Sequence, residues 1–299
     1  MWFGVICGFC AALCNTVGYF FSARFLRESP SPLRLLISAQ VLMMVFAAPF
    51  IAFLYPEGGI GNSGRFAWIL AAWIGFFWLG QFGFFTTQKH LEASRLASLL
   101  GLKIIILAFI FIAVEGQLPG SGQWVAIVLA TAAAVMMNWS RAGHITAVGA
   151  LILLLTLASY SCCDIAETEM VMLAKGNGTV LRSAFFTAVL AYTVLGAVSL
   201  PAAFAIRVTR RELASSAPYA VLWLVSQALL MVCFGLVKPV FGNVILASRG
   251  FFSVIVGAAL PFFGLRGLDA DIPARQWVRR AVAALLMIAA IAIYSRAVA

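Results

Sequence analysis

The stretch SLLGLKIIILAF, residues 98–109, places one lysine, Lys103, inside an otherwise apolar run. A second stretch, VILASRGFFSV, residues 244–254, places Arg249 in the same setting in the other half of the chain. A cation in the hydrocarbon core of a bilayer costs about 2.5–3.5 kcal/mol, and such residues usually face the interior of a helix bundle or a wet cavity. Two cations at matching positions therefore predict one shared polar site.

The composition excludes an ordinary soluble domain. Of the 299 residues, 64% are hydrophobic and 10% are charged, whereas soluble domains carry about 25% charged residues. The net charge of +10 comes from basic residues in short gaps between apolar runs, a distribution typical of topology signals and lipid headgroup contacts. We therefore expect a multi-pass membrane protein whose partner is the lipid bilayer and not a nucleic acid.

Apolar windows long enough to cross a bilayer recur along the whole chain, since about 20 residues suffice for one helix. They lie near residues 2–23, 34–55, 66–87, 95–114, 123–139, 146–172, 183–206, 217–237, 241–264 and 276–295. The sequence thus predicts an all-α membrane protein with ten transmembrane helices.

The ten windows divide into two five-helix units, residues 1–140 and 145–299. Corresponding residues recur in the two units: Arg34 with Arg182, Pro49 with Pro201, Gln81 with Gln227, and Lys103 with Arg249. Because five is odd, the two units cross the membrane in opposite senses if all windows span. Inverted repeats of this kind are typical of secondary transporters, which bind their substrate near the midplane between the repeats.

Two parts of the chain resemble a known family. Residues 94–140, with ASLL at 97–100, EGQL at 115–118 and QWVA at 123–126, are similar to the fourth and fifth helices of an EamA-type repeat of the drug/metabolite transporter superfamily. Residues 243–295 are similar to the second copy of that repeat. The resemblance implies a transporter of small metabolites in the bacterial inner membrane that hydrolyses no ATP, and it leaves a homodimer open.

Sequence signals for an enzyme are missing. The chain has no Gly-x-x-x-x-Gly-Lys-Ser/Thr phosphate loop, and both histidines, His90 and His144, fall at predicted helix ends. The six cysteines lie in apolar runs without a zinc-like pattern. We expect no catalytic residue, no cofactor and no metal.

Lys103 and Arg249 are the strongest candidates for a binding site. They are predicted either to hold an anionic group in a central cavity, with Arg249 making a two-pronged contact, or to be structural cations neutralised by buried acids. Gln81 and Gln227 are predicted either to orient the substrate or to form hydrogen bonds between helices.

The densest polar run within an apolar window is SYSCCDIAETE, residues 159–169, which contains the candidate substrate contact Tyr160. Asp164 and Glu167 are three residues apart and share one helix face. Asn15 occupies the position in the first unit that Asp164 occupies in the second, and it is a further candidate for substrate contact.

Three roles compete for Asp164. It is predicted to neutralise Lys103 or Arg249, to bind the ammonium group of a zwitterionic substrate, or to carry a proton coupled to transport. The remaining alternative is a simple acid at the membrane interface. Glu167 either shares the counter-charge or proton-carrying role or, like Glu169, is a solvated charge near the end of the helix.

The sequence therefore predicts a secondary active transporter that moves a small polar metabolite, anionic or zwitterionic, by alternating access. One alternative is an exporter of aromatic or cationic compounds, with Asp164 and Glu167 binding the substrate and the two cations structural. Another is a flippase for phosphorylated lipid carriers.

Overall fold

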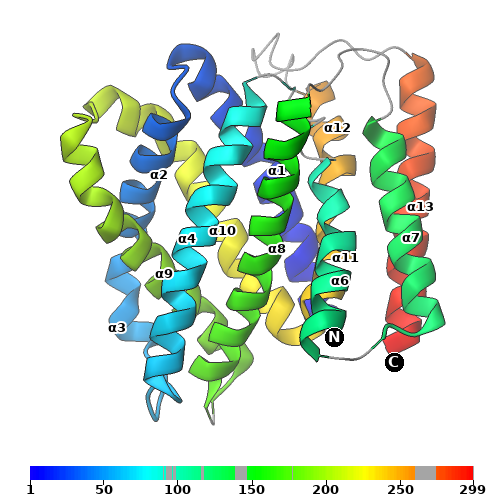
Figure 1. The fold of residues 1–299 in the computed structure, drawn as a ribbon, viewed down its shortest axis with the longest axis horizontal. Helices are drawn as coiled ribbons and strands as arrows, with labels where there is room; N and C mark the ends of the chain where they lie inside the picture. Colours follow the sequence, from blue (N-terminus) through cyan, green and yellow to red (C-terminus); the bar gives the residue numbers. More distant parts are fainter. Residues whose placement is uncertain are drawn as a thin grey trace.

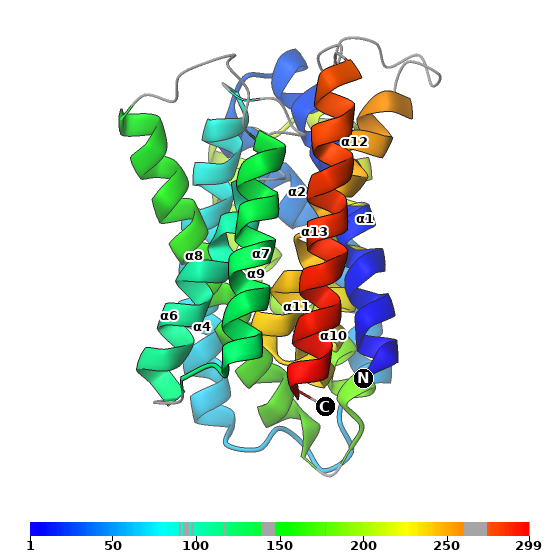
Figure 2. The same cartoon turned by 90° about the vertical axis from the view of Figure 1, so that its right-hand side faces the viewer.

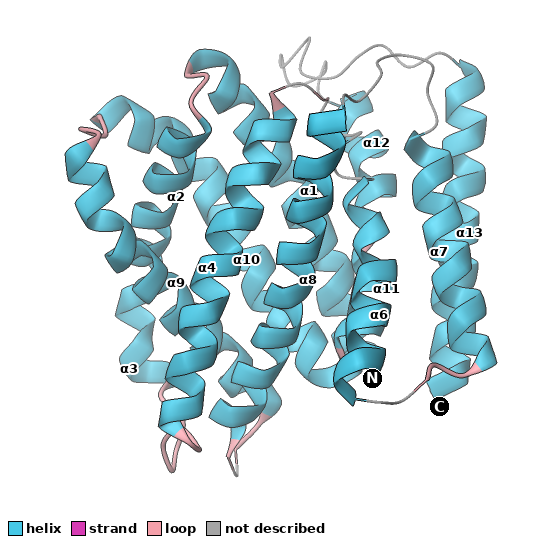
Figure 3. Cartoon of the chain, viewed as in Figure 1, coloured by secondary structure: helices cyan, strands magenta, loops and turns pink. Residues whose placement is uncertain are grey.

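The computed structural model describes residues 1–89, 91, 96, 99–115, 118–138, 147–176, 178–259 and 274–298. Within these ranges the regular secondary structure is helical and no strand occurs (Figure 3). The prediction of an all-α protein is thereby confirmed for the described part of the chain. His90 and His144 lie outside the described residues.

The described helices follow one another along the chain. They are α1 (Trp2–Glu28), α2 (Pro32–Ala47), η1 (Ala48–Phe50), α3 (Ile51–Leu54), α4 (Ser63–Gln88), η2 (Leu100–Leu102), α6 (Lys103–Glu115), α7 (Ser121–Asn138), α8 (Ala147–Lys175), α9 (Val180–Ala205), α10 (Arg210–Val237), α11 (Pro239–Leu246), α12 (Arg249–Ala259) and α13 (Ala274–Val298).

Seven helical segments of the described chain are long and apolar enough to cross a membrane. They are Trp2–Glu28, Pro32–Leu54, Ser63–Gln88, Ala147–Lys175, Val180–Ala205, Arg210–Val237 and Pro239–Gly257. Shorter apolar helical stretches lie at Leu100–Ile110, Ser121–Ala133 and Leu285–Tyr294. These segments support a multi-pass integral membrane protein, whereas ten spanning helices stay a prediction.

Large apolar side chains cover the outer surface of the bundle. Trp68, Phe204 and Leu285, from three different helices, are 75%, 77% and 66% exposed. Exposed apolar surface on this scale is unfavourable in water but suits contact with lipid tails. The surface therefore agrees with the membrane class derived from composition.

The helices form one bundle with both chain termini at the same end (Figures 1 and 2). Helices α2, α3 and α9 lie at one edge of the bundle, and α7 and α13 lie side by side at the other. Helices α1, α4, α8 and α10 stand between these edges.

Helices α2 and α9 cross closely at Gly196. A Cβ atom there would collide with the side chain of Met44 and the backbone oxygen of Gln40. Next to this point the buried hydroxyl of Ser199 donates a hydrogen bond to Oε1 of Gln40. The two helices are therefore locked together near their middle by a position that requires glycine.

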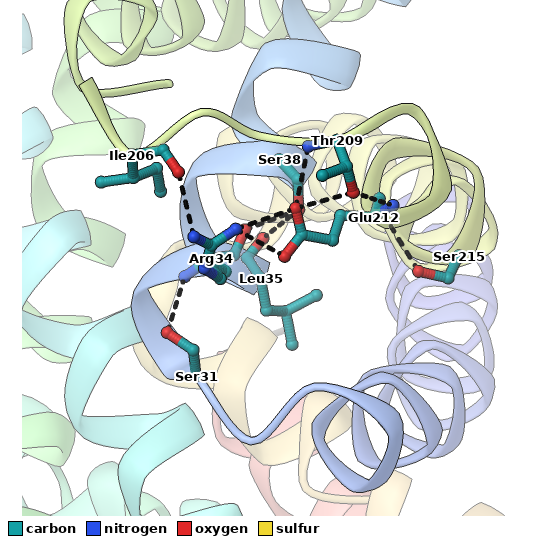
Figure 4. A network of polar contacts seen from close by, with 8 residues as sticks. All are labelled: Ser31, Arg34, Leu35, Ser38, Ile206, Thr209, Glu212 and Ser215. Atoms are coloured by element: carbon teal, nitrogen blue, oxygen red, sulfur yellow. Dashed lines mark hydrogen bonds and ion pairs between the residues drawn. The ribbon is translucent and has the colours of Figure 1, made fainter. Parts of the chain in front are cut away.

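An arginine at the start of α2 ties that helix to the end of α9 (Figure 4). Arg34 Nη1 donates to both carboxylate oxygens of Glu212, at 2.8 and 3.0 Å, and its Nη2 donates to the backbone oxygen of Ile206 at 3.0 Å. Glu212 also forms a capping box with Thr209 at the start of α10. This cluster joins the beginning of α2, the end of α9 and the beginning of α10.

A corresponding arginine at the start of α9 makes the same kind of contact. Arg182 pairs with the carboxylate of Glu57 and donates to the backbone oxygen of Tyr55 at 3.0 Å, just beyond the end of α3. The sequence pairs Arg34 with Arg182, and the structure gives each a carboxylate and a carbonyl beyond the end of the partner helix. The α2–α9 pair is thus clamped at both ends.

The two clamps differ in burial, and this difference predicts their contributions to stability. The side chains of Arg34 and Glu212 are 35% and 14% exposed, against 40% and 85% for Arg182 and Glu57. Glu212→Gln keeps a residue that suits the capping box but removes the charge, and we expect a loss of about 1.5–3 kcal/mol. Glu57→Gln should cost less than about 1 kcal/mol. Thermal unfolding of the two variants in detergent measures both, and equal losses would contradict the role given to burial.

Candidate functional site

A cavity lies at the centre of the bundle, with about 350 Å³ of empty space that includes its opening to solvent. It is lined by Asn15, Tyr19, Phe77, Lys103, Tyr160, Cys163, Asp164, Glu167, Trp223, Gln227, Leu230, Leu246 and Arg249. These residues come from both halves of the chain. Because that figure includes open solvent, the enclosed space is smaller than the range for small-molecule sites, so a ligand of that class requires the lining helices to move apart.

Both predicted cations begin a helix inside the bundle. Lys103 is the first residue of α6, directly after the 3-10 turn Leu100–Leu102. Arg249 is the first residue of α12, and α11 ends three residues earlier. The predicted helix near residues 241–264 is therefore interrupted, and the one near 95–114 changes its winding at the cation. Interrupted helices of this kind place positive helix ends beside a site.

Lys103 forms a buried ion pair with Asp164 of α8. Its Nζ lies 3.0 Å from Oδ1 and 2.8 Å from Oδ2 of the carboxylate, and the two side chains are 5% exposed. Asn243 Nδ2 donates a further hydrogen bond to Oδ2. Among the three predicted roles for Asp164, this geometry favours neutralisation of Lys103.

Arg249 has no such partner. Its residue is 4% exposed, Nη1 donates to the hydroxyl of Tyr19 at 3.4 Å, and Nε has no hydrogen-bond partner. No acid of the described chain forms an ion pair with it. The two cations that the sequence placed in one role are therefore in different electrostatic states.

Each cation contacts the first helix of the opposite half. Lys103 of the first half reaches α8, and Arg249 of the second half reaches Tyr19 of α1. The hydroxyl of Thr16 on α1 also donates to the backbone oxygen of Arg249, at 3.2 Å. Asn15 lines the cavity where the sequence correspondence places the counterpart of Asp164, and its Oδ1 has no partner. The first half of the chain therefore presents the neutral amide of Asn15 at the position where the second half presents the carboxylate of Asp164.

Glu167 is buried in the cavity wall, so its interpretation as a solvated charge is wrong. It is 3% exposed, its Oε1 accepts a hydrogen bond from Trp73 Nε1 at 3.0 Å, and its Oε2 has no partner. The helix face that carries Asp164 also carries Glu167, and it points into the bundle. Glu169, on another face, pairs with Arg65 at the surface.

The two glutamines are not equivalent. Gln227 lines the cavity. Gln81 is buried outside the lining and accepts a hydrogen bond from the hydroxyl of Tyr219, at 3.2 Å. Its geometry therefore agrees with the interhelical alternative, and only Gln227 remains a candidate for contact with a substrate.

Tyr160 lines the cavity as a candidate substrate contact should. Its ring centroid lies 5.8 Å from Nζ of Lys103, within the range of a cation–π interaction. Its hydroxyl has no hydrogen-bond partner.

Sequence reasoning missed several residues of the site. Among them are Tyr19 and Trp223, which together with Phe77 form its aromatic wall, with ring centroids 6.1–6.2 Å apart where they contact one another. Tyr19 follows Asn15 by one helical turn, and this spacing could have identified it. Asn243 and Trp73 have no distinguishing signal in the sequence. The described side chains contain no group of three or more His, Cys, Asp or Glu that could hold a metal ion.

Comparison with known proteins supports the fold alone. No protein-family model and no curated protein matches the chain. A solved structure described only as "Crystal structure of protein" matches with a TM-score of 0.59 and 15% sequence identity, over 97% of this chain and 96% of that one. The chain therefore shares its overall architecture with a solved protein along nearly its full length.

The buried ion pair predicts a specific pattern of stability. Lys103→Gln leaves Asp164 as an uncompensated buried charge and should cost about 3–5 kcal/mol. Lys103→Gln combined with Asp164→Asn removes both charges together, and most of that loss should be recovered. Thermal unfolding in detergent compares the two proteins. A double variant as unstable as the single one would show that the pair is not the reason for the loss.

Proposed function

We propose that the protein is a secondary active transporter that moves a small anionic or zwitterionic metabolite by alternating access. The observation that carries this proposal is the buried guanidinium of Arg249, which no acid of the described chain neutralises. A charge held in this way in a bundle of membrane helices is unfavourable unless an opposite charge joins it. A carboxylate or phosphate group would supply that charge and could accept two parallel hydrogen bonds.

The substrate site is proposed to lie between two inverted five-helix repeats, residues 1–140 and 145–299. The corresponding clamps of Arg34 and Arg182 support this arrangement, as do the helices that begin at Lys103 and Arg249. Both termini lie at one end, as an even number of spans requires (Figure 1). We extend the proposal to the EamA-type repeat of the drug/metabolite transporters and to the bacterial inner membrane, on the resemblance of residues 94–140 and 243–295.

In this proposal the two halves differ at the position that decides whether the facing cation is neutralised. Asp164 neutralises Lys103, whereas Asn15, its counterpart, leaves Arg249 unpaired. Arg249 would hold the anionic group of the substrate, Gln227 and Tyr160 would contact its polar parts, and the aromatic wall would cover the rest. Lys103 serves by fixing α6 to α8.

The aromatic wall favours a second candidate function. Tyr19, Phe77, Tyr160 and Trp223 surround a cavity that also contains the Glu167 carboxyl, and aromatic faces attract organic cations. An exporter of cationic or aromatic compounds would use these groups and leave Arg249 structural.

A ligand panel on purified protein distinguishes the two. Thermal shifts would be measured with L-lactate, inorganic phosphate, L-glutamate, L-alanine and tetraphenylphosphonium. We expect an anionic or zwitterionic ligand to stabilise wild type and Lys103→Gln/Asp164→Asn, by about 2.7 kcal/mol at a hundredfold excess over its dissociation constant. Arg249→Gln should show no shift. Stabilisation by tetraphenylphosphonium alone, equal in all three proteins, would favour the second candidate.

Asn15→Asp tests the asymmetry without removing Arg249. An aspartate there would supply the missing counter-charge, so we expect anion binding to fall at least about tenfold because the internal carboxylate competes with the ligand. Asn15→Ser, which adds no charge, is the matched control and should bind within a few fold of wild type. Anion binding in Asn15→Asp as tight as in wild type would contradict the proposed place of the anion.

A further inference from the structure

Glu167 differs in its partners from Asp164, the other acid that lines the cavity. Trp73 Nε1 can only donate, so Oε1 of Glu167 is the acceptor of their 3.0 Å hydrogen bond. Oε2 is buried without any partner. A proton on a neutral Glu167 would therefore sit on Oε2.

The groups around Glu167 leave its ionised form uncompensated. The titratable and charged residues that face it or share its cavity are Tyr19 of α1, Lys103 of α6, Asp164, Cys163 and Tyr160 of α8, Tyr192 of α9 and Arg249 of α12. Lys103 is engaged by both oxygens of Asp164, at 2.8 and 3.0 Å. No ion pair within the described ranges includes Glu167.

A carboxylate buried without a cation in contact is costly, and a proton removes that cost. Asp164 shows the contrast within the same helix, since it accepts hydrogen bonds from both Lys103 and Asn243. Of the two buried acids on this face, Asp164 has the contacts that stabilise an ionised carboxylate, whereas the contacts of Glu167 favour a neutral carboxyl group.

We propose that Glu167 is a proton-binding site, with the proton on Oε2, and that the proton occupies the cavity together with the anionic group held by Arg249. The second of these claims, that the proton and the anion occupy the cavity together, rests on the proposed function. The proton comes from water when the cavity is open and is released to water on the other side, with the O–H bond of the carboxyl formed and broken once per cycle.

The charges of the cavity determine whether the binding of a proton favours or opposes the binding of an anion. Lys103 and Asp164 cancel, so a neutral Glu167 leaves the single positive charge of Arg249 for an anion. An ionised Glu167 would place a negative charge in the same cavity and repel that anion. Proton and anion therefore bind cooperatively, and anion affinity falls as the pH rises through the titration of Glu167.

Infrared spectroscopy of the ligand-free protein tests the proton itself. In H₂O and D₂O at neutral pH, wild type should show the carbonyl band of a protonated carboxylic acid, shifted by deuteration. Glu167→Gln should lack the band, while it keeps an oxygen to accept from Trp73. Glu169→Gln, at the surface pair with Arg65, is the matched control and should retain it. Absence of the band in wild type, or its persistence in Glu167→Gln, would overturn the proton site whatever the protein transports.

The pH dependence of anion binding tests the coupling. Thermal shifts with L-lactate and L-glutamate, whose carboxylates stay ionised over this range, would be compared at about pH 6 and about pH 9. In wild type the affinity should fall at least about tenfold at the higher pH, and in Glu167→Gln it should stay the same. An equal fall in both proteins would overturn the coupling. Absence of anion binding at both pH values would overturn the coupling and the proposed function together, and the infrared band would still report on the proton site.

Discussion

The ion pair between Lys103 and Asp164 is the interaction on which the rest of the site depends. It joins α6 of one half to α8 of the other, inside a bundle whose surroundings are apolar. Two charges removed from water are tolerated only as a close pair with further hydrogen bonds, and Asn243 supplies one. Because Lys103 is neutralised in this way, Arg249 is the cation of the cavity that forms no ion pair within the described part of the chain. The pair thus decides which cation is available to a ligand.

The helices that carry this site differ from those that hold the bundle edge. The cavity is lined from α1, α4, α6, α8, α10, α11 and α12. No lining residue comes from α2 or α9, which cross at Gly196 and are clamped at both ends by Arg34 and Arg182. The clamped pair is therefore a frame at one edge of the bundle. Rearrangements that open the cavity are expected among the other helices.

The sequence alone identified the residues whose charge is costly to place within an apolar run. A lone charge in an apolar run is expensive wherever it lies, so Lys103, Arg249 and Asp164 could be identified without a structure. The partners could not be identified, because the pairing of Lys103 with Asp164, and of Glu167 with Trp73, depends on how distant helices pack. For the same reason the sequence could not decide between the alternatives for Glu167, and it could not distinguish Gln81 from Gln227. Helix positions followed from hydropathy, whereas the interruption before Arg249 has no hydropathy signal.

In the proposed function, Arg249 holds the substrate anion while Lys103 and Asp164 neutralise each other. Counterflow of the stabilising anion in reconstituted vesicles tests it most directly, with wild type, Arg249→Gln and Lys103→Gln/Asp164→Asn compared at equal protein density. We expect exchange in wild type and in the double variant and none in Arg249→Gln. Exchange by Arg249→Gln at the wild-type rate would contradict it.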